Sequence, residues 1–291
     1  MTYFAQLKTL VRATKLLGPL RGPAAFSTSL LYRRSKSRRW ARKELRIPEL
    51  QHPILYRPGT SDWDVIESVL MEKEYNFAKF DAQAQAMAIY YDRILSQGKT
   101  PIILDCGANI GLSAIWFANA FPSAAVIAVE PEPENFDLLT LNSRPYSNIM
   151  PIRAGVCPHR TRIRLQNENG EPWAWKTSVA EDGDTEGLTI PDLLSRVADG
   201  VPFIFKIDIE GAEGGLFEGN PEWAQKVPLI VIETHDWQLP WSGTGHAVFS
   251  CLSSEKKDYM QVGASTFAFS HALLVSGRSM DTNVLADAVA N

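Results

Sequence analysis

The residues best suited to chemistry gather in one short loop near the middle of the chain. An apolar run ends at Asp105, and a loop with Gly107, Asn109 and Gly111 leads from it into an apolar segment with helical spacing. Glycines let a backbone turn tightly and approach a ligand. Free N–H groups at the start of the following helix favour an anionic group, either a carboxylate or a phosphate. The pattern therefore predicts a strand, a turn and a helix around a bound cofactor.

A second acidic residue, Glu130, ends the next strand-like run, at 125–129. Its spacing from Asp105 is what a nucleoside-binding βαβ unit needs, because a carboxylate there can accept both ribose hydroxyls. Asp105 itself suits a ligand with a positively charged amine. S-adenosylmethionine carries an amine, a carboxylate and a ribose diol, and we predict it as the cofactor. The predicted cofactor-binding residues are Asp105, Gly107, Asn109, Gly111, Glu130 and Asp208.

Two other ligand classes use similar loops, and the sequence argues against both. A nicotinamide-type G-x-G-x-x-G needs a glycine where Asn109 stands, and a P-loop needs a Gly-Lys-Ser/Thr that does not follow. A purely structural interpretation has Asp105 capping the helix and the glycines serving packing. It is less favoured because Glu130 stands in register with the loop.

Charged residues follow two further strand-like runs. Lys206, Asp208 and Glu210 alternate along one face of a strand, and Glu233 and His235 share a face just past the next one. Buried charges are costly unless they are paired or used. We predict His235 as the general base and Asp208 as the second choice, with Lys206 holding carboxylates or polarising the group that reacts. The alternative is that Lys206 merely neutralises its neighbours.

The same carboxylates and histidine form an oxygen-rich set of potential metal ligands. Such a set favours magnesium or manganese over zinc. No tight ligand spacing in the sequence demands an ion, so we predict no metal.

The expected elements place these residues on one rim of a sheet. From Pro101, short apolar strands alternate with helices, which predicts a mostly parallel sheet covered on both faces. Ligands of such sheets bind at the carboxyl ends of the strands. Thr189 and Asp192 predict a capping box at the start of a helix. The expected strands are 101–105, 125–130, 149–154, 203–209 and 229–233, the helices 82–96, 110–120, 133–142 and 190–198, and the hairpins 161–179 and 259–276.

Charge divides the chain into a basic arm and an acidic body. Residues 1–46 hold twelve Lys/Arg and one acidic residue, a net charge of +11, whereas the rest carries −15 and the whole 291-residue chain −4. Three interpretations of the arm stay open: a solvated, partly disordered segment, an amphipathic helix on an anionic membrane surface, or an organelle transit peptide. Nucleic acid is not an expected partner, because the body is acidic and no reading motif accompanies the arm.

The remaining composition indicates a cytoplasmic protein. The three cysteines are odd in number and widely spaced, which fits a reducing compartment. The uncharged stretch 106–129 is long enough to span a bilayer, but glycine, asparagine and proline interrupt it, so no transmembrane helix is predicted. We expect a cytoplasmic location, or a peripheral one at the membrane through residues 1–46. Residues 47–100 are expected to form a helical cap on a Rossmann-like domain at 101–291.

Several segments occur in a familiar order and spacing. They are Arg57-x-Gly59-Thr60-Ser61-Asp62, Glu74-Tyr75, Asp105-x-Gly107-Ala108-Asn109-Ile110-Gly111, Glu130-Pro131-x-Pro133-Glu134-Asn135-Phe136, Lys206-Ile207-Asp208-Ile209-Glu210-Gly211-Ala212-Glu213 and Glu233-Thr234-His235. Together they resemble the FkbM family of S-adenosylmethionine-dependent methyltransferases over about residues 55–235.

This resemblance implies a fold and a reaction. The fold is the α/β class I methyltransferase fold, a Rossmann-like, seven-stranded, mostly parallel sheet with helices on both faces and an antiparallel last strand. The reaction is O-methylation of a hydroxyl on a small molecule or glycan: a sugar, glycolipid, polysaccharide or other secondary metabolite. Two alternatives stay open: a nicotinamide-dependent oxidoreductase on the same fold, and a non-catalytic binding protein held at membranes by the basic arm.

Overall fold

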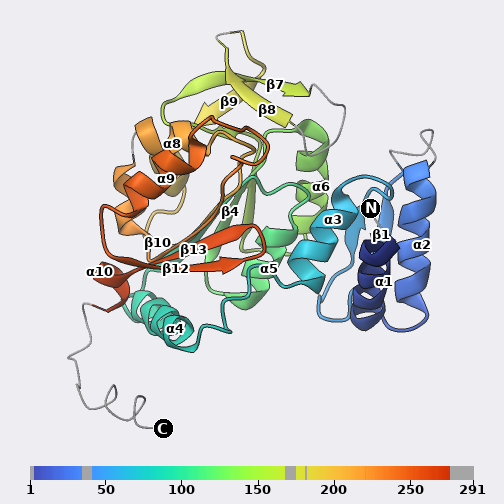
Figure 1. Cartoon of the computed structure of the whole chain (residues 1–291). Coiled ribbons are helices and arrows are strands. Elements are labelled where there is room, and N and C mark those ends of the chain that lie inside the picture. The colour runs from blue at the N-terminus through green and yellow to red at the C-terminus, as the bar shows by residue number, and fades with distance from the viewer. Residues whose placement is uncertain (1–2, 35–40, 168–174, 181, 220, 276–291) are drawn as a thin grey trace.

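The computed structural model describes residues 3–34, 41–167, 175–180, 182–219 and 221–275 (Figure 1). Its centre is a seven-stranded sheet in the order β12-β13-β11-β10-β3-β4-β5. Only β13 runs antiparallel to the other six strands of this sheet. This strand order and the single reversed strand confirm the predicted class I methyltransferase fold. The strands are β3 (Thr100–Cys106), β4 (Ala125–Val129), β5 (Ile149–Ile152), β10 (Gly200–Ile207), β11 (Leu229–Glu233), β12 (Lys257–Val262) and β13 (Ser265–Ser270).

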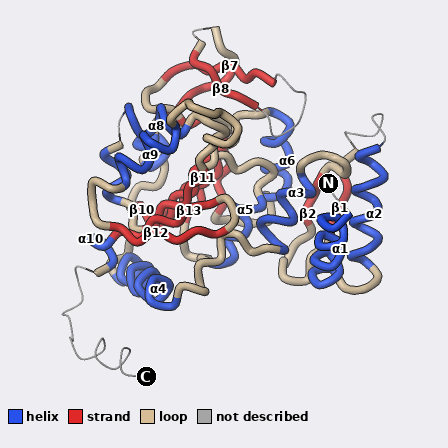
Figure 2. The backbone as a smooth tube through the Cα atoms, viewed as in Figure 1, coloured by secondary structure: helices blue, strands red, loops and turns tan. Residues whose placement is uncertain are grey.

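Helices cover both faces of this sheet (Figures 1 and 2). Successive residues of a strand point to opposite faces, so β3 supplies two separate cores. Ile103 belongs to the core covered by α4, α5 and α6, whereas Ile102 and Leu104 belong to the core covered by α7, α8 and α9. These helices are α4 (Asp81–Ser96), α5 (Leu112–Ala120), α6 (Pro133–Ser143), α7 (Ile190–Leu194), α8 (Glu213–Gly219) and α9 (Thr244–Leu252).

The strand order reverses between β3 and β10, which lie side by side at the centre of the sheet. A sheet of this type binds its ligand in the crevice at such a switch point. The two strands are in register, with Lys206 directly beside Asp105 and Ile207 beside Cys106. The pairing therefore brings the two predicted charged motifs together.

A second, four-stranded sheet lies at the top of Figure 1, in the order β6-β9-β7-β8. Its antiparallel β7–β8 pair is the predicted hairpin, and the turn expected near 167–170 lies largely outside the described residues. The predicted capping box is also confirmed, because Thr189 and Asp192 exchange side-chain-to-backbone hydrogen bonds at the start of α7. The strands are β6 (Gly155–Val156), β7 (Thr161–Asn167), β8 (Trp175–Val179) and β9 (Thr185–Leu188).

The amino-terminal part forms an additional layer at the right of Figure 1. Residues expected to be a partly disordered arm or one amphipathic helix form two helices, and Leu16, Leu17 and Phe26 are buried. Thr9 and Arg12 of the first helix hydrogen-bond the carboxylate of Glu67. The region expected to be loop and helical cap also contains a two-stranded sheet and a π-helical turn. The elements are α1 (Tyr3–Leu17), α2 (Arg21–Arg34), β1 (Lys43–Leu45), β2 (Ile54–Tyr56), α3 (Asp62–Ile66) and η2 (Glu67–Met71).

Two short helices complete the described chain: η3 (Glu222–Lys226) and α10 (His271–Leu274). The second strand of the final hairpin was expected to reach 276, but β13 ends at Ser270 and α10 follows directly. None of the described helices combines the length and the apolar composition needed to cross a bilayer.

Candidate active site

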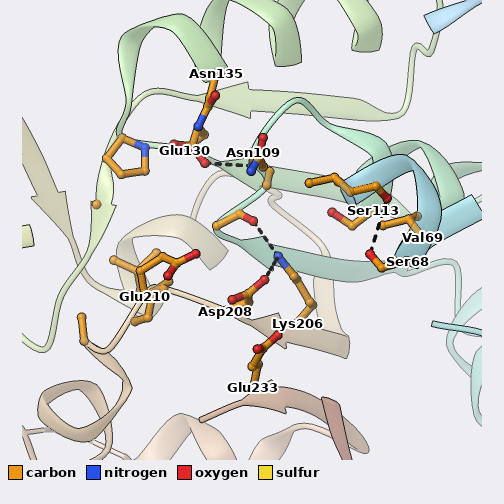
Figure 3. Close-up of a pocket in the computed structure, with 18 of the residues that line it drawn as sticks. Ser68, Val69, Asn109, Ser113, Glu130, Asn135, Lys206, Asp208, Glu210 and Glu233 are labelled. Carbon is orange, nitrogen blue, oxygen red and sulfur yellow. Dashed lines mark hydrogen bonds and ion pairs between the residues drawn. The ribbon is translucent and has the colours of Figure 1, made fainter. Parts of the chain in front are cut away.

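One cavity opens at the carboxyl ends of the central strands (Figure 3). The glycine turn after β3, the end of β4 and the segment after β10 all contribute to its lining. The cap adds η2 and the residues after it, and the small sheet adds β6. Most of the predicted site residues therefore meet in one place. The charged and polar lining residues are Ser68, Glu74, Asn109, Ser113, Glu130, Asn135, Lys206, Asp208, Glu210 and Glu233.

The glycine turn is built for close backbone approach. Gly107 has φ of +81°, and a Cβ at this position would collide with the carbonyl oxygen of Asp208. Asn109 is also left-handed, with φ of +50°, and its side chain accepts a hydrogen bond from the Ile110 N–H at 2.8 Å. Gly111, with φ of +91°, begins α5. The turn thus locks the end of β3 against the segment that follows β10.

Asp105 lies behind the cavity. Its carboxylate is fully buried, accepts a hydrogen bond from the Ser113 hydroxyl at 2.6 Å, and lies 3.3 Å from the Lys206 ammonium. It was predicted to contact the cofactor directly. The structure shows it in contact with Ser113 and Lys206, and its role at the cofactor stays a prediction.

Glu130 occupies the position predicted for a ribose-binding carboxylate. Its two oxygens accept backbone N–H groups of Asn109 at 2.8 Å and Glu132 at 2.9 Å. The side chain is 5% exposed, and burial raises its pKa to about 7. Hydrogen bonds to the backbone fix the carboxylate beside the glycine turn.

Lys206 links the two sides of the switch point. Its ammonium donates to the carbonyl oxygen of Gly107 at 2.5 Å and lies 3.3 Å from oxygens of both Asp105 and Asp208. Burial opposes its charge, but the two carboxylates outweigh burial and raise the pKa of Lys206. Lys206 therefore stays charged and holds Asp208 at the cavity wall.

His235 lies behind Asp208, just past the end of β11. Its ring is 2% exposed, and Nδ1 lies 2.9 Å from Oε1 of Glu213. Nε2 faces Asp208 and Glu210 at 3.6 Å and Glu233 at 4.0 Å. Burial opposes protonation, but the hydrogen bond and charge of Glu213 raise the pKa of His235 to about 9.

The other carboxylates at this edge are crowded. Burial and the charge of Asp208 raise the pKa of Glu210 to about 8 and that of Glu233 to about 7. Glu74, from the cap, accepts a hydrogen bond from the Ser265 hydroxyl at 2.9 Å, and burial raises its pKa. This edge carries more negative than positive groups.

The sequence analysis did not assign roles to Glu213 and Glu74. Glu213 is fully buried and accepts backbone N–H groups of Ile209 at 2.9 Å and Gly211 at 3.3 Å, in addition to its contact with His235. The only signal for either residue was its place in a motif of the resemblance.

The comparison with known families identifies the chain. Residues 105–259 match the methyltransferase FkbM domain, which is more than half of the sequence. The chain belongs to this family.

Individual relatives are methyltransferases. Hexuronic acid methyltransferase AglP of Haloferax volcanii is 30% identical over 145 residues, which are 46% of this chain and 56% of that protein. Methyltransferase sdnD of Sordaria araneosa is 31% identical over 203 residues, which are 55% of this chain and 77% of that protein. Among solved structures, precorrin-6y C5,15-methyltransferase of Geobacter metallireducens aligns over 63% of this chain and 87% of that chain, with a TM-score of 0.35 and 12% identity. The match thus spans little more than half the length of AglP.

An upstream segment of this FkbM-family chain supports the cavity from outside the matched domain. Arg57 is buried, and its guanidinium donates to Asp62 at 2.7 Å and to the side-chain oxygen of Asn135 at 2.5 Å. Asn135 lies on α6 and lines the cavity beside Glu130 (Figure 3). The Arg57–Asp62 pair therefore joins the cap to the wall of the cavity formed by Asn135 and Glu130. Membership of the FkbM methyltransferase family gives no support to the alternative of a nicotinamide-dependent oxidoreductase.

Proposed function

We propose that this FkbM-family protein transfers a methyl group from S-adenosylmethionine to a hydroxyl of a sugar, glycolipid, polysaccharide or other secondary metabolite. The observation that carries the proposal is that Glu130, the glycine turn and Asp208 line one cavity. Among the relatives, a hexuronic acid methyltransferase and a 2-O-methyltransferase of Sinorhizobium fredii, 24% identical over 159 residues, support a sugar hydroxyl as the acceptor.

The residues at the glycine turn fit the cofactor. Gly107 leaves the backbone bare where a Cβ would not fit, and Glu130 presents a fixed carboxylate suited to the ribose hydroxyls. Five carboxylates and the Lys206 ammonium line the cavity, which complements a ligand with a sulfonium and an amine. When bound, S-adenosylmethionine supplies a methyl group that is already activated for transfer. Asp105 would act on this ligand through Lys206.

Asp208 is better placed than His235 to meet the acceptor hydroxyl. Its side chain is 28% exposed and lines the cavity, whereas His235 is 2% exposed and lies behind it. His235 is protonated near neutral pH in this arrangement, because its pKa is about 9. A protonated imidazole accepts no proton, so we assign proton acceptance to Asp208 and positioning roles to His235 and Lys206.

The reaction needs alignment and removal of one proton. The O–C bond forms as the S–C bond breaks, its electron pair stays on sulfur, and the hydroxyl proton passes to the carboxylate cluster. Alignment of the two reactants contributes up to ~7–11 kcal/mol, and a positioned base contributes roughly 10²–10⁴-fold in rate.

The proposal is tested by calorimetry with S-adenosylmethionine, followed by transfer of a labelled methyl group to a panel of glycosides and glycolipids. We expect binding at one site per chain and label on a hydroxyl oxygen. Mass spectrometry of glycans from cells with and without the protein would then identify the acceptor by a missing methyl increment. A folded chain that does not bind S-adenosylmethionine would refute the proposal.

We also propose that the α1–α2 layer attaches the protein to anionic membranes. Its outer surface exposes Leu7, Val11, Leu20 and Leu31, and residues 1–43 contain no acidic side chain. Apolar side chains among basic ones bind anionic lipid surfaces. The full chain should co-sediment with phosphatidylglycerol vesicles but not with phosphatidylcholine vesicles, and a Leu20→Ser, Leu31→Ser variant should lose this binding. Equal recovery with both lipids would contradict it.

A further inference from the structure

A group of potential metal ligands lies at the acceptor side of the cavity. One carboxylate oxygen from Asp208, one from Glu233 and a ring nitrogen of His235 all lie within 4.8 Å of one another. Figure 3 shows Asp208 and Glu233 on one side of Lys206, and Glu130 with Asn109 on the other. The group is therefore separate from the residues assigned to the cofactor ribose.

The state of His235 gives an independent indication of a ligand. Nδ1 of His235 lies 2.9 Å from Oε1 of Glu213 and donates to it when Nδ1 carries a proton. A cation that displaces the proton on Nε2 would then meet the lone pair of that nitrogen. Within the described part of the chain Nε2 makes no hydrogen bond, although the ring is 2% exposed and this nitrogen faces three carboxylates. A carboxylate behind an imidazole is the arrangement that orients metal-binding histidines.

The distances favour a shared cation over a direct ion pair. A protonated imidazole in direct contact would lie about 2.7–2.9 Å from a carboxylate oxygen. The observed separations from Nε2 are 3.6 Å to Asp208 and 4.0 Å to Glu233. Ligands held at about 2.1 Å from one octahedral cation lie about 3.0 Å apart when adjacent and about 4.2 Å apart when opposite. The observed separations lie between these two values, so a small shift of the side chains would bring all three ligand atoms around one cation.

We propose that Asp208, Glu233 and His235 bind one divalent cation. Two carboxylate oxygens with one imidazole nitrogen favour Mn²⁺ over Mg²⁺, because magnesium prefers ligand sets made of oxygen alone. The sequence predicted no metal because its three ligands come from two strand ends and show no local spacing motif. The topology of the sheet brings them together.

The catalytic role of the cation rests on the proposed methyl transfer. A bound cation acts as a Lewis acid on an oxygen in contact with it, and so lowers the pKa of an acceptor hydroxyl. Asp208 would then hold the cation through one carboxylate oxygen and keep the other to accept the hydroxyl proton, with His235 and Glu233 as the other ligands.

The test is a Mn²⁺ titration of the full-length, chelator-treated protein, followed by electron paramagnetic resonance. We expect one site per chain and a hyperfine signal from a coordinated imidazole nitrogen. His235→Gln should remove the nitrogen signal, and Asp208→Asn and Glu233→Gln should each weaken Mn²⁺ binding at least tenfold. The exposed controls His159→Gln and Glu49→Gln should bind like the unmodified chain. Glu233 is at the cavity rim, so its variant covers the case in which the buried His235 variant does not fold.

Each outcome decides a separate claim. Absence of Mn²⁺ binding by the folded, unmodified chain overturns the cation site, as does binding without a nitrogen signal. Methyl transfer at full rate in excess chelator overturns the catalytic role and leaves the methyltransferase proposal intact. Mn²⁺ binding by a chain that ignores S-adenosylmethionine supports the site and refutes the methyltransferase proposal.

Discussion

The carboxylates on the two sides of the cavity have different partners. At the ends of β3 and β4, Asp105 contacts Ser113 and Lys206, and Glu130 receives two backbone N–H groups. At the ends of β10 and β11, Asp208, Glu210 and Glu233 instead surround one buried imidazole at 3.6 Å or more. The carboxylates of the first side already have partners in the folded protein, so this side suits a ligand of constant shape. The second side holds three carboxylates around one imidazole, with Lys206 3.3 Å from Asp208, and fits the cation proposed above.

The largest expected effect comes from the second side. Asp208→Asn removes the carboxylate that faces the cavity, so the rate of methyl transfer should fall roughly 10²–10⁴-fold. The affinity for S-adenosylmethionine, measured by calorimetry, should fall much less than the rate. A variant that loses cofactor binding as strongly as turnover would erase the proposed division between the two sides.

The next effect tests the contact that joins the two sides. Gly107→Ala places a Cβ against the carbonyl oxygen of Asp208, whereas Gly98→Ala, at φ of +69°, meets nothing within 4 Å. Both variants bear the cost of a left-handed backbone, about 1–3 kcal/mol in the free energy of unfolding. Gly107→Ala should lose a further ~1–3 kcal/mol from overpacking, together with cofactor binding. Equal losses in urea unfolding would show that the close approach is unimportant.

A third prediction concerns Glu130 and pH. Its folded pKa of about 7 lies above the ordinary 4.5, so the folded state holds this proton more tightly than the unfolded chain. Its contribution to stability is therefore present below pH 4.5 and is lost as pH rises towards 7. Cofactor affinity should change in the opposite direction, because the ionised carboxylate is the better acceptor of ribose hydroxyls.

Glu130→Gln separates these two effects. It should weaken S-adenosylmethionine binding about 10- to 100-fold at pH 8 and flatten the pH dependence of both affinity and unfolding free energy. The exposed Glu49→Gln variant should retain both slopes. Steep slopes that persist in Glu130→Gln would assign the titration to another group.

The smallest effect should arise away from both sides. Thr189→Ala removes the capping box of α7 and should cost about 1 kcal/mol, or roughly 2–4 °C in Tm. Cofactor affinity should be unchanged. The variant therefore shows how far a loss of stability alone affects the measurements made on the other variants. Weaker cofactor binding by Thr189→Ala would mean that the site responds to any loss of stability.

Local patterns predicted the parts of the fold that local chemistry controls. The alternation of strands and helices from Pro101 onward predicted the sheet, and Thr189 with Asp192 predicted the capping box. By contrast, the second N-terminal helix was missed because it has little amphipathic pattern. It is stabilised by close contact with α1, where a Cβ on Gly22 would strike the backbone of Ala13. The sequence alone does not show such a contact between two helices.

The site shows the same division. The sequence placed Glu130, Lys206 and Asp208 at one rim because parallel strands end together. It ranked His235 above Asp208 and placed Asp105 at the ligand, and these roles stay predictions. It did not show that Asp105 and His235 are buried, because residue type alone does not reveal which side chain lies behind another. It gave no role to Glu213, because the function of this buried carboxylate at the start of α8 depends on its contact with His235, which lies just past β11.

The close approach of Gly107 to Asp208 has a consequence for how this family diversifies. The residues proposed to bind the methyl donor and those proposed to activate the hydroxyl meet where Gly107 contacts the backbone of Asp208. A change in the backbone on one side would therefore also move the other. Among its described residues, the small sheet lines the cavity through Gly155 and Val156 of β6, away from this contact. Exchange of residues 155–188 between family members would test whether this segment selects the acceptor without altering the contact between Gly107 and Asp208.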